Sequence, residues 1–298
     1  MSQLEDIGPL PDDFLSTPKP DISVYQVDFA KTDLPQYASK YAVILDDVLS
    51  KKECEQLIKA AESTTNEGWE RAMINIGGGR QMLATEARNC GRIIWDSREV
   101  VGRVWKRIED IAAVQQITSL YKAPGIMGNG PSKRGETWKF TRPNERMRFL
   151  KYVGGEYFRP HCDGCYETPD GTERSWFTLH LYLNDADRPT GKELAKVMQG
   201  DEGTCAKYGL VGGATTFHSF NMEKQLDVWP KAGRILIFQH RDLLHSGDDV
   251  LHGVKYTMRT DLMYSLDSVE GEKEEAVPAN GGLRGTYKRL GSRLKKQG

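Results

Sequence analysis

The six histidines of this 298-residue chain all fall between residues 161 and 252, and the first of them opens a short motif. In the segment PHCDGC, His161 and Asp163 stand two residues apart, a spacing that directs both side chains to one face of a β-strand. Two imidazoles and one carboxylate form the facial triad of non-haem iron sites, which leaves coordination positions open. The motif therefore predicts two ligands of a metal site, although His-x-Asp alone has low specificity.

The same segment also contains Cys162 and Cys165, which could form a redox pair or half of a zinc site. A structural zinc site needs four ligands, and the other three cysteines are isolated from one another along the chain. A thioredoxin-like pair should open a helix, whereas the following YETPDGTER predicts a loop. We therefore favour the metal interpretation and expect Cys162 to point to the opposite face of the strand.

A third metal ligand is expected from a distant strand. The segment GRILIFQHRDLLHSGDDVLHGVKYTMRTDLMY offers three candidates: His240, His245 and His252. In the strand that follows, alternation places four polar residues on one face: Lys255, Thr257, Arg259 and Asp261. Such a face lines either solvent or a pocket, and the residues alone do not decide between these two possibilities or among the three histidines.

The elements that must position these residues are mostly strands. KYAVILDDVLS predicts a strand, Ser50 and Glu53 form a capping box that opens a helix, and Asp96 and Glu99 repeat that pattern before a second apolar helix face. From about residue 145 onward, short apolar or alternating runs are separated by Gly, Asp and Pro, as in a β-sandwich or barrel. The fold class expected is α+β, with helices packed on one face of a double sheet. The polar segment 188–210 is expected to be an insertion loop.

Three regions are expected along the chain: an N-terminal arm (1–40), one domain (41–268) and a charged, mobile tail (269–298). The formal net charge is -1, yet residues 281–298 carry six basic and no acidic side chains, so the tail is either solvated or touches an acidic partner. No apolar window is long enough to span a membrane, and the first residues lack a signal-peptide pattern. Five cysteines without a disulfide pattern, and no glycosylation sequon, favour an intracellular protein, cytoplasmic or nuclear.

Several motifs occur in an order that resembles the prolyl 4-hydroxylase-like Fe(II)/2-oxoglutarate dioxygenases. They are RFLKYVGGEYFRPHCDG, FTLHLYLND, GGATTF, PKAGRILIF, LLHSG and VKYTMRTDLMY. With the strand–helix opening YAVILDDVLSKKECEQLIKAA, the resemblance covers roughly residues 41 to 266. It implies a double-stranded β-helix (jelly-roll) core and an oxidoreductase that uses Fe(II), 2-oxoglutarate and dioxygen, with ascorbate as reductant.

The resemblance also assigns roles to residues. It makes His161, Asp163 and His245 the iron ligands, and Lys255 the cation that binds the distal carboxylate of 2-oxoglutarate. Further co-substrate contacts are expected from four residues: Tyr152, Tyr182, Thr178 and Thr257. Three residues are candidates for substrate contact: Arg259, Arg174 and Trp176. For Arg259, an ion pair with Asp261 or a bracing role in the pocket are alternatives, and we favour the pair.

The substrate is not decided by the fold. The resemblance favours hydroxylation of a prolyl or other residue in a protein or peptide, whereas the wider superfamily also acts on free amino acids and small metabolites. A second class of function is a non-catalytic jelly-roll binding module, which the presence of all four metal and co-substrate residues disfavours. Nucleic-acid demethylation is disfavoured too, because the Asn-x-Thr-x-Arg ending of the AlkB-like group is absent and the body of the chain is net acidic. The oligomeric state is left open.

Overall fold

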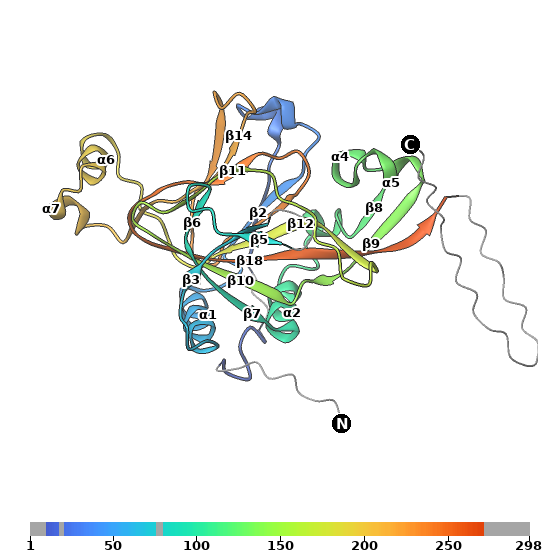
Figure 1. The fold of residues 1–298 in the computed structure, drawn as a ribbon, viewed down its shortest axis with the longest axis horizontal. Coiled ribbons are helices and arrows are strands. Elements are labelled where there is room, and N and C mark those ends of the chain that lie inside the picture. The colour runs from blue at the N-terminus through green and yellow to red at the C-terminus, as the bar shows by residue number, and fades with distance from the viewer. Residues whose placement is uncertain (1–9, 18–20, 76–79, 271–298) are drawn as a thin grey trace, which may run out of the picture.

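A computed structural model describes residues 10–17, 21–75 and 80–270 (Figure 1). The expected tail, 269–298, lies outside the described residues from 271 onward. Within them, no helix has both the length and the apolar character that a membrane crossing requires.

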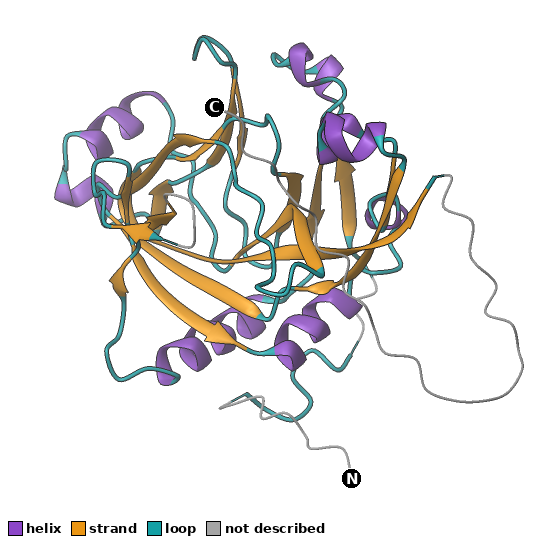
Figure 2. Ribbon diagram, turned by 45° about the vertical axis from the view of Figure 1, so that its right-hand side comes forward, coloured by secondary structure: helices purple, strands orange, loops and turns teal. Residues whose placement is uncertain are grey.

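Two antiparallel sheets form the core of the molecule (Figures 1 and 2). The large sheet has the strand order β1 (Ser23–Gln26), β2 (Ala42–Asp46), β16 (Ile235–Gln239), β12 (Glu173–Tyr182), β18 (Val250–Val269), β10 (Arg146–Val153), β7 (Gly91–Asp96) and β3 (Glu70–Arg71), with β13 (Leu210–Gly212), β8 (Ser119–Tyr121) and β9 (Glu136–Pro143) attached to it. The small sheet has the order β15 (Gln225–Val228), β14 (Thr215–His218), β17 (His245–Gly247), β11 (Tyr157–His161) and β6 (Arg88–Asn89). A separate hairpin joins β4 (Ile74–Asn75) to β5 (Gln81–Met82). From β10 to β18 the chain passes repeatedly between the two sheets, as in the double-stranded β-helix that the resemblance implied.

Two helices cover the outer face of the large sheet, α1 (Lys51–Ser63) and α2 (Arg98–Lys106) (Figure 2). Their buried residues share one core cluster with residues from β10, β12 and β18. The predicted capping box is present at α1, where Ser50 N donates to Glu53 at 2.7 Å and Ser50 Oγ accepts from Glu53 N at 3.3 Å. The second predicted box is wrong by one residue: Ser97, not Asp96, caps α2, because its hydroxyl accepts from Val100 N at 3.2 Å.

The N-terminal region packs against the domain instead of trailing away from it. β1 pairs with β2, and Leu10, Phe14 and Leu15 are buried in the same core cluster as the apolar residues of α1 and α2. The short helices η1 (Phe29–Lys31) and η2 (Pro35–Tyr37) bury aromatic residues against β14 and β16. Residues 10–17 and 21–40 therefore complete the core at two places.

The prediction of a loop at 188–210 is wrong in one respect, because the segment contains two helices, α6 (Gly191–Met198) and α7 (Glu202–Cys205). Both project from the body of the molecule (Figure 1). Asp201 caps α7 by accepting from Thr204 N at 2.9 Å. Val197, Cys205 and Val211 form a small cluster of their own, which holds the two helices together. The remaining helices are α3 (Ala112–Gln115), α4 (Pro124–Met127) and α5 (Asn129–Lys133).

Candidate metal and co-substrate site

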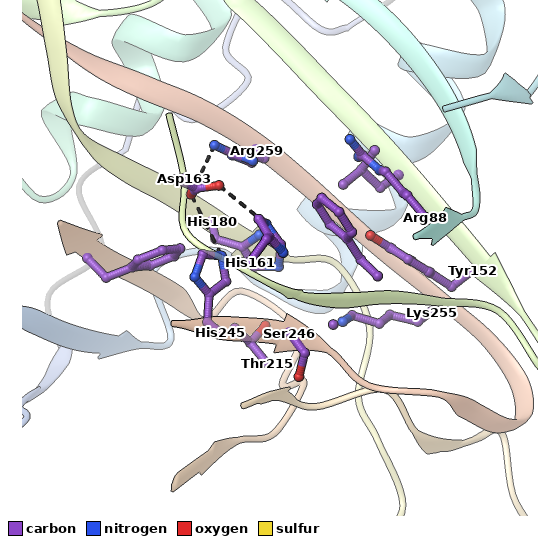
Figure 3. A pocket seen from close by; sticks show the side chains of 14 residues that line it. Arg88, Tyr152, His161, Asp163, His180, Thr215, His245, Ser246, Lys255 and Arg259 are labelled. Atoms are coloured by element: carbon purple, nitrogen blue, oxygen red, sulfur yellow. Dashed lines mark ion pairs between the residues drawn. The ribbon is translucent and has the colours of Figure 1, made fainter. Parts of the chain in front are cut away.

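The three residues expected to bind iron meet at the inner face of the small sheet. His161 ends β11, Asp163 follows it, and His245 begins β17, directly opposite His161 in the strand register. One potential ligand atom from each lies within 4.8 Å of the other two (Figure 3). The other two candidate histidines lie elsewhere: His240 is buried against Asp261, and His252 is half-buried where β18 pairs with β13. The geometry thus selects His245.

Both imidazoles are oriented by their own backbone. His161 Nδ1 lies 2.8 Å from the carbonyl oxygen of Arg159, and His245 Nδ1 lies 3.0 Å from that of Leu243. Because a carbonyl can only accept, each Nδ1 donates to the backbone, which leaves each Nε2 to face the metal-ligand cluster. The Nε2 atoms of His161 and His245 face Asp163 at 3.5 and 3.8 Å, and that of His161 is buried without a hydrogen-bond partner among the described residues. Backbone-oriented imidazoles with free Nε2 atoms are typical of a metal site.

The protonation states of these groups also suit a metal cation. Burial raises the pKa of Asp163, but the Arg259 guanidinium and the two imidazoles outweigh it and hold that pKa well below its usual range. Burial, together with His161, lowers the pKa of His245 to about 3. The site therefore offers a carboxylate and a neutral imidazole at neutral pH, as divalent metals require.

Two side chains hold Asp163 in place. Thr178 Oγ1 donates to Asp163 Oδ2 at 2.6 Å, and Arg259 Nη2 lies 3.0 Å from the same oxygen. Arg259 lies further from Asp261, at 3.7 Å, and Asp261 accepts from Arg148 Nη1 at 3.0 Å. The closer ion-pair partner of Arg259 is therefore Asp163, and its contact with Asp261 is the longer one.

Lys255 lies in the same pocket and lacks an anionic partner. Its side chain is 1% exposed, and within the described ranges no carboxylate oxygen comes within 4.0 Å of its ammonium. The ammonium lies over the rings of Tyr152 and Tyr182, at 5.1 and 5.9 Å from their centroids. Burial lowers the pKa of Lys255 from 10.5 to about 8. A buried cation without a partner is costly, so an anionic ligand is expected beside it.

Gly213 makes room for this lysine. It adopts φ +71°, and a Cβ at this position would lie 3.0 Å from Lys255 Cδ. A side chain at residue 213 would therefore press on the lysine and be strained in its own backbone.

The pocket is lined from both sheets. Besides the metal-ligand candidates, Tyr152, Lys255 and Arg259, its wall contains Arg88, Leu150, Phe158, His180, Thr215, Phe238, Ser246 and Gly247. Sequence analysis did not single out Thr215 or Ser246, although both lie inside motifs that it quoted, GGATTF and LLHSG. Alternation along β14 and β17 is the signal that could have identified them, because it separates the side chains that face Lys255 from those that face away.

The other predicted co-substrate residues take different positions. Tyr152 is buried and lines the pocket. The ring of Tyr182 faces the Lys255 ammonium, and its hydroxyl lies 3.4 Å from the carbonyl oxygen of Val228. Thr257 is fully buried opposite Tyr182, and its hydroxyl has no partner in the part of the chain that the structure describes. Thr178 faces Asp163.

Two of the predicted substrate residues lie outside the pocket wall. Arg174 forms an ion pair with Glu167 and lies over the ring of Trp176 at 5.6 Å. Trp176 is buried in the core, where it packs against Trp138 with ring centroids 5.8 Å apart. Arg259 is the predicted substrate residue that does line the pocket.

Comparison with known proteins adds a family match for the central part of the chain. Residues 147–260 match the model of the 2OG-Fe(II) oxygenase superfamily. Similar solved structures include the viral collagen prolyl hydroxylase of Paramecium Bursaria Chlorella virus-1 (20% identity over 76% of this chain and 97% of that chain, TM-score 0.44) and a prolyl-4-hydroxylase of Pseudomonas putida (13%, 78% and 97%, TM-score 0.45). A third is a Trichoplax adhaerens prolyl hydroxylase in complex with a hypoxia inducible factor peptide fragment (15%, 80% and 89%, TM-score 0.44). No curated protein matches the chain.

Proposed function

We propose that the chain hydroxylates a C–H bond of a prolyl or other residue in a protein or peptide, because residues 147–260 match the model of the 2OG-Fe(II) oxygenase superfamily. The family match confirms the expected enzyme class, a 2-oxoglutarate-dependent dioxygenase, and with it the expected use of Fe(II), 2-oxoglutarate and dioxygen. One observation carries the proposal: the His161, Asp163 and His245 cluster shares a pocket with a buried lysine that has no anionic partner within residues 10–17, 21–75 and 80–270.

The residues present fit the metal. His161, Asp163 and His245 would hold Fe(II), because two Nε2 atoms and one carboxylate converge and the His161 Nε2 has no partner in the part of the chain that the structure describes. When bound, Fe(II) and 2-oxoglutarate would supply the oxidising chemistry with dioxygen as the oxidant: 2-oxoglutarate would be converted to succinate and CO2, with one oxygen atom of dioxygen entering succinate and the other the substrate C–H bond.

The protein's own part in this chemistry is to bind and orient. Lys255 would pair with the distal carboxylate of 2-oxoglutarate through a charge-assisted hydrogen bond. Thr215 and Tyr152 line the pocket with it and offer hydroxyl groups. Apolar rings limit the access of water to the imidazoles: Phe158 stacks on His161 at 3.7 Å between centroids, and Phe238 meets His245 edge-on at 4.7 Å.

The ordered motifs that resemble the prolyl 4-hydroxylase-like enzymes support a peptidyl substrate and ascorbate as reductant. The test is to incubate the Fe(II)-loaded protein with ascorbate, 2-oxoglutarate and two pools, one of proline-containing peptides and one of free amino acids. We expect mass spectrometry to show the gain of one oxygen atom in peptides with wild type and none with Asp163→Ala. Oxygen gained only by free amino acids would contradict the peptidyl assignment.

We also propose that the dioxygenase domain spans residues 41–268, with residues 10–17 and 21–40 packed against its core, and that the protein works inside the cell, in the cytoplasm or nucleus. All five cysteines are free thiols, which suits a reducing compartment. Imaging of a fluorescent fusion of the full chain tests this location, and a secreted fusion would contradict it.

A further inference from the structure

Two buried nitrogen atoms beside the metal-ligand cluster have no partner among the described residues. They are Arg259 Nε, on β18, and His180 Nε2, on β12. The two residues are directly opposite in the strand register, and both line the pocket that contains Lys255. Buried polar atoms in folded proteins are almost always hydrogen-bonded, so two orphaned nitrogens at one point of a pocket need an explanation.

The contacts that hold Asp163 in place use only one of the three guanidinium nitrogens of Arg259. A guanidinium has five N–H donors, and the contacts of Arg259 with Asp163, Thr178 and Asp261 all use Nη2. In addition, Thr178 already donates to the same Asp163 oxygen at 2.6 Å. The remaining donors of Arg259 are free for a ligand that lies next to Asp163.

The charges around Arg259 favour an anion once a metal is present. Arg148, Arg259, Asp163 and Asp261 form a chain of ion pairs in which the formal charges cancel. A divalent cation on Asp163 adds two positive charges to this balanced group. An acceptor that bears negative charge therefore suits the free donors of Arg259 better than a neutral one.

Arg259 is also well placed relative to Lys255. The two residues lie on the same face of β18, four positions apart, which is about 13 Å along a strand. In Figure 3 Arg259 lies beside Asp163, and Lys255 lies on the other side of the two histidines. A ligand with an acidic group at each end can thus meet one cation near the metal and another at the far end of the pocket.

We propose that Arg259, with His180 beside it, forms a second carboxylate subsite, which binds the metal-chelating carboxylate of the 2-oxo acid. This inference rests on the proposed function. It assigns Lys255 to the distal carboxylate and Arg259 to the proximal one, and it makes the His180 imidazole an additional hydrogen-bonding partner of the same carboxylate.

The test uses the Co(II)-loaded protein and calorimetry, with 2-oxoglutarate as ligand and pyruvate as a competitor that keeps the 2-oxo acid but has no distal carboxylate. At saturating Co(II), Arg259→Met should weaken binding of both ligands by roughly tenfold or more, the loss that one charge-assisted hydrogen bond implies. Lys255→Met should weaken the binding of 2-oxoglutarate and leave the binding of pyruvate unchanged. His180→Leu should weaken both ligands less than Arg259→Met does.

Thr178→Val is the matched control, because it also removes a contact to Asp163 Oδ2 but takes no ligand donor away. The subsite is refuted if pyruvate binds to Arg259→Met as it does to Thr178→Val, since both residues would then act only on Asp163. Arg259→Lys serves if the methionine variant does not load Co(II); it keeps the charge, so an intermediate loss is expected and wild-type pyruvate binding would refute the subsite. Failure of the wild type to bind 2-oxoglutarate at all would refute the proposed function instead.

Discussion

Under the proposed function, Lys255 would stabilise a bound anion at the expense of the ligand-free fold, so its replacement should raise the stability of the free protein and weaken binding of the anion. Burial lowers the pKa of Lys255 from 10.5 to about 8, and a change of one in pKa corresponds to about 1.4 kcal/mol. The charged lysine therefore costs the ligand-free protein about 3 kcal/mol below pH 8. Because the folded state binds the proton more weakly than the unfolded state, this cost fades as the pH rises from 8 to 10.5.

Lys255→Met removes the buried charge and keeps an apolar side chain of similar length. At pH 7 we expect the metal-free variant to be more stable than wild type by up to about 3 kcal/mol, and to have lost the rise in stability above pH 8. In the same variant the Kd of 2-oxoglutarate should rise by roughly ten- to 150-fold, because a hydrogen bond to a charged group contributes about 1.5–3 kcal/mol.

Urea unfolding of the metal-free protein gives the stability, and calorimetry on the Co(II)-loaded protein gives the Kd. Lys151→Met is the control, since Lys151 is a half-buried lysine of β10 that lies over the Trp69 ring at 5.7 Å and does not line the pocket. It should change neither the pH dependence of stability nor the affinity for 2-oxoglutarate. A Lys255→Met variant that is less stable than wild type, or that binds 2-oxoglutarate equally well, would refute the reasoning.

Three further predictions concern the metal cluster and two glycines. Asp163→Ala should lose Co(II) binding in calorimetry while its urea unfolding shows that it is still folded; metal binding at wild-type affinity would contradict the ligand assignment. Gly213→Ala should weaken 2-oxoglutarate binding, because the new Cβ would lie 3.0 Å from Lys255 Cδ at φ +71°, and an unchanged Kd would show that the lysine can move aside. Gly233→Ala should unfold at a markedly lower urea concentration, since its Cβ would lie 1.8 Å from the backbone oxygen of Leu49; an unchanged midpoint would refute that clash.

Local patterns predicted the parts of the site that depend on alternation. The spacing of His161 and Asp163 predicted that both side chains lie in one cluster, and they do. The alternation of Lys255 and Arg259 predicted that they share one strand face, but it did not decide between solvent and the pocket that both line. The third ligand was different, because three histidines satisfied the same local pattern. Only the pairing of β17 with β11, which joins residues more than 80 positions apart, selects His245.

Contacts across strands were the hardest to predict. Sequence analysis favoured Asp261 as the partner of Arg259, because the two are neighbours on one strand face, whereas the closer oxygen belongs to Asp163, which follows β11 of the other sheet. The helices at 191–205 were expected to be a loop because the segment is polar. They are held by a three-residue apolar cluster and an aspartate cap. Three apolar residues are too few to give a recognisable helical period in so polar a segment.

The measurement that tests the central claim most directly is release of labelled CO2 from 2-oxoglutarate by the protein loaded with Fe(II) in the absence of oxygen and then exposed to oxygen with ascorbate. The account predicts release that requires Fe(II) and is lost in Asp163→Ala and in His245→Ala. Release that persists in these variants, or none in the wild type even with the peptide and amino-acid pools present, would contradict the assignment of this pocket to 2-oxoglutarate-dependent oxygenase chemistry.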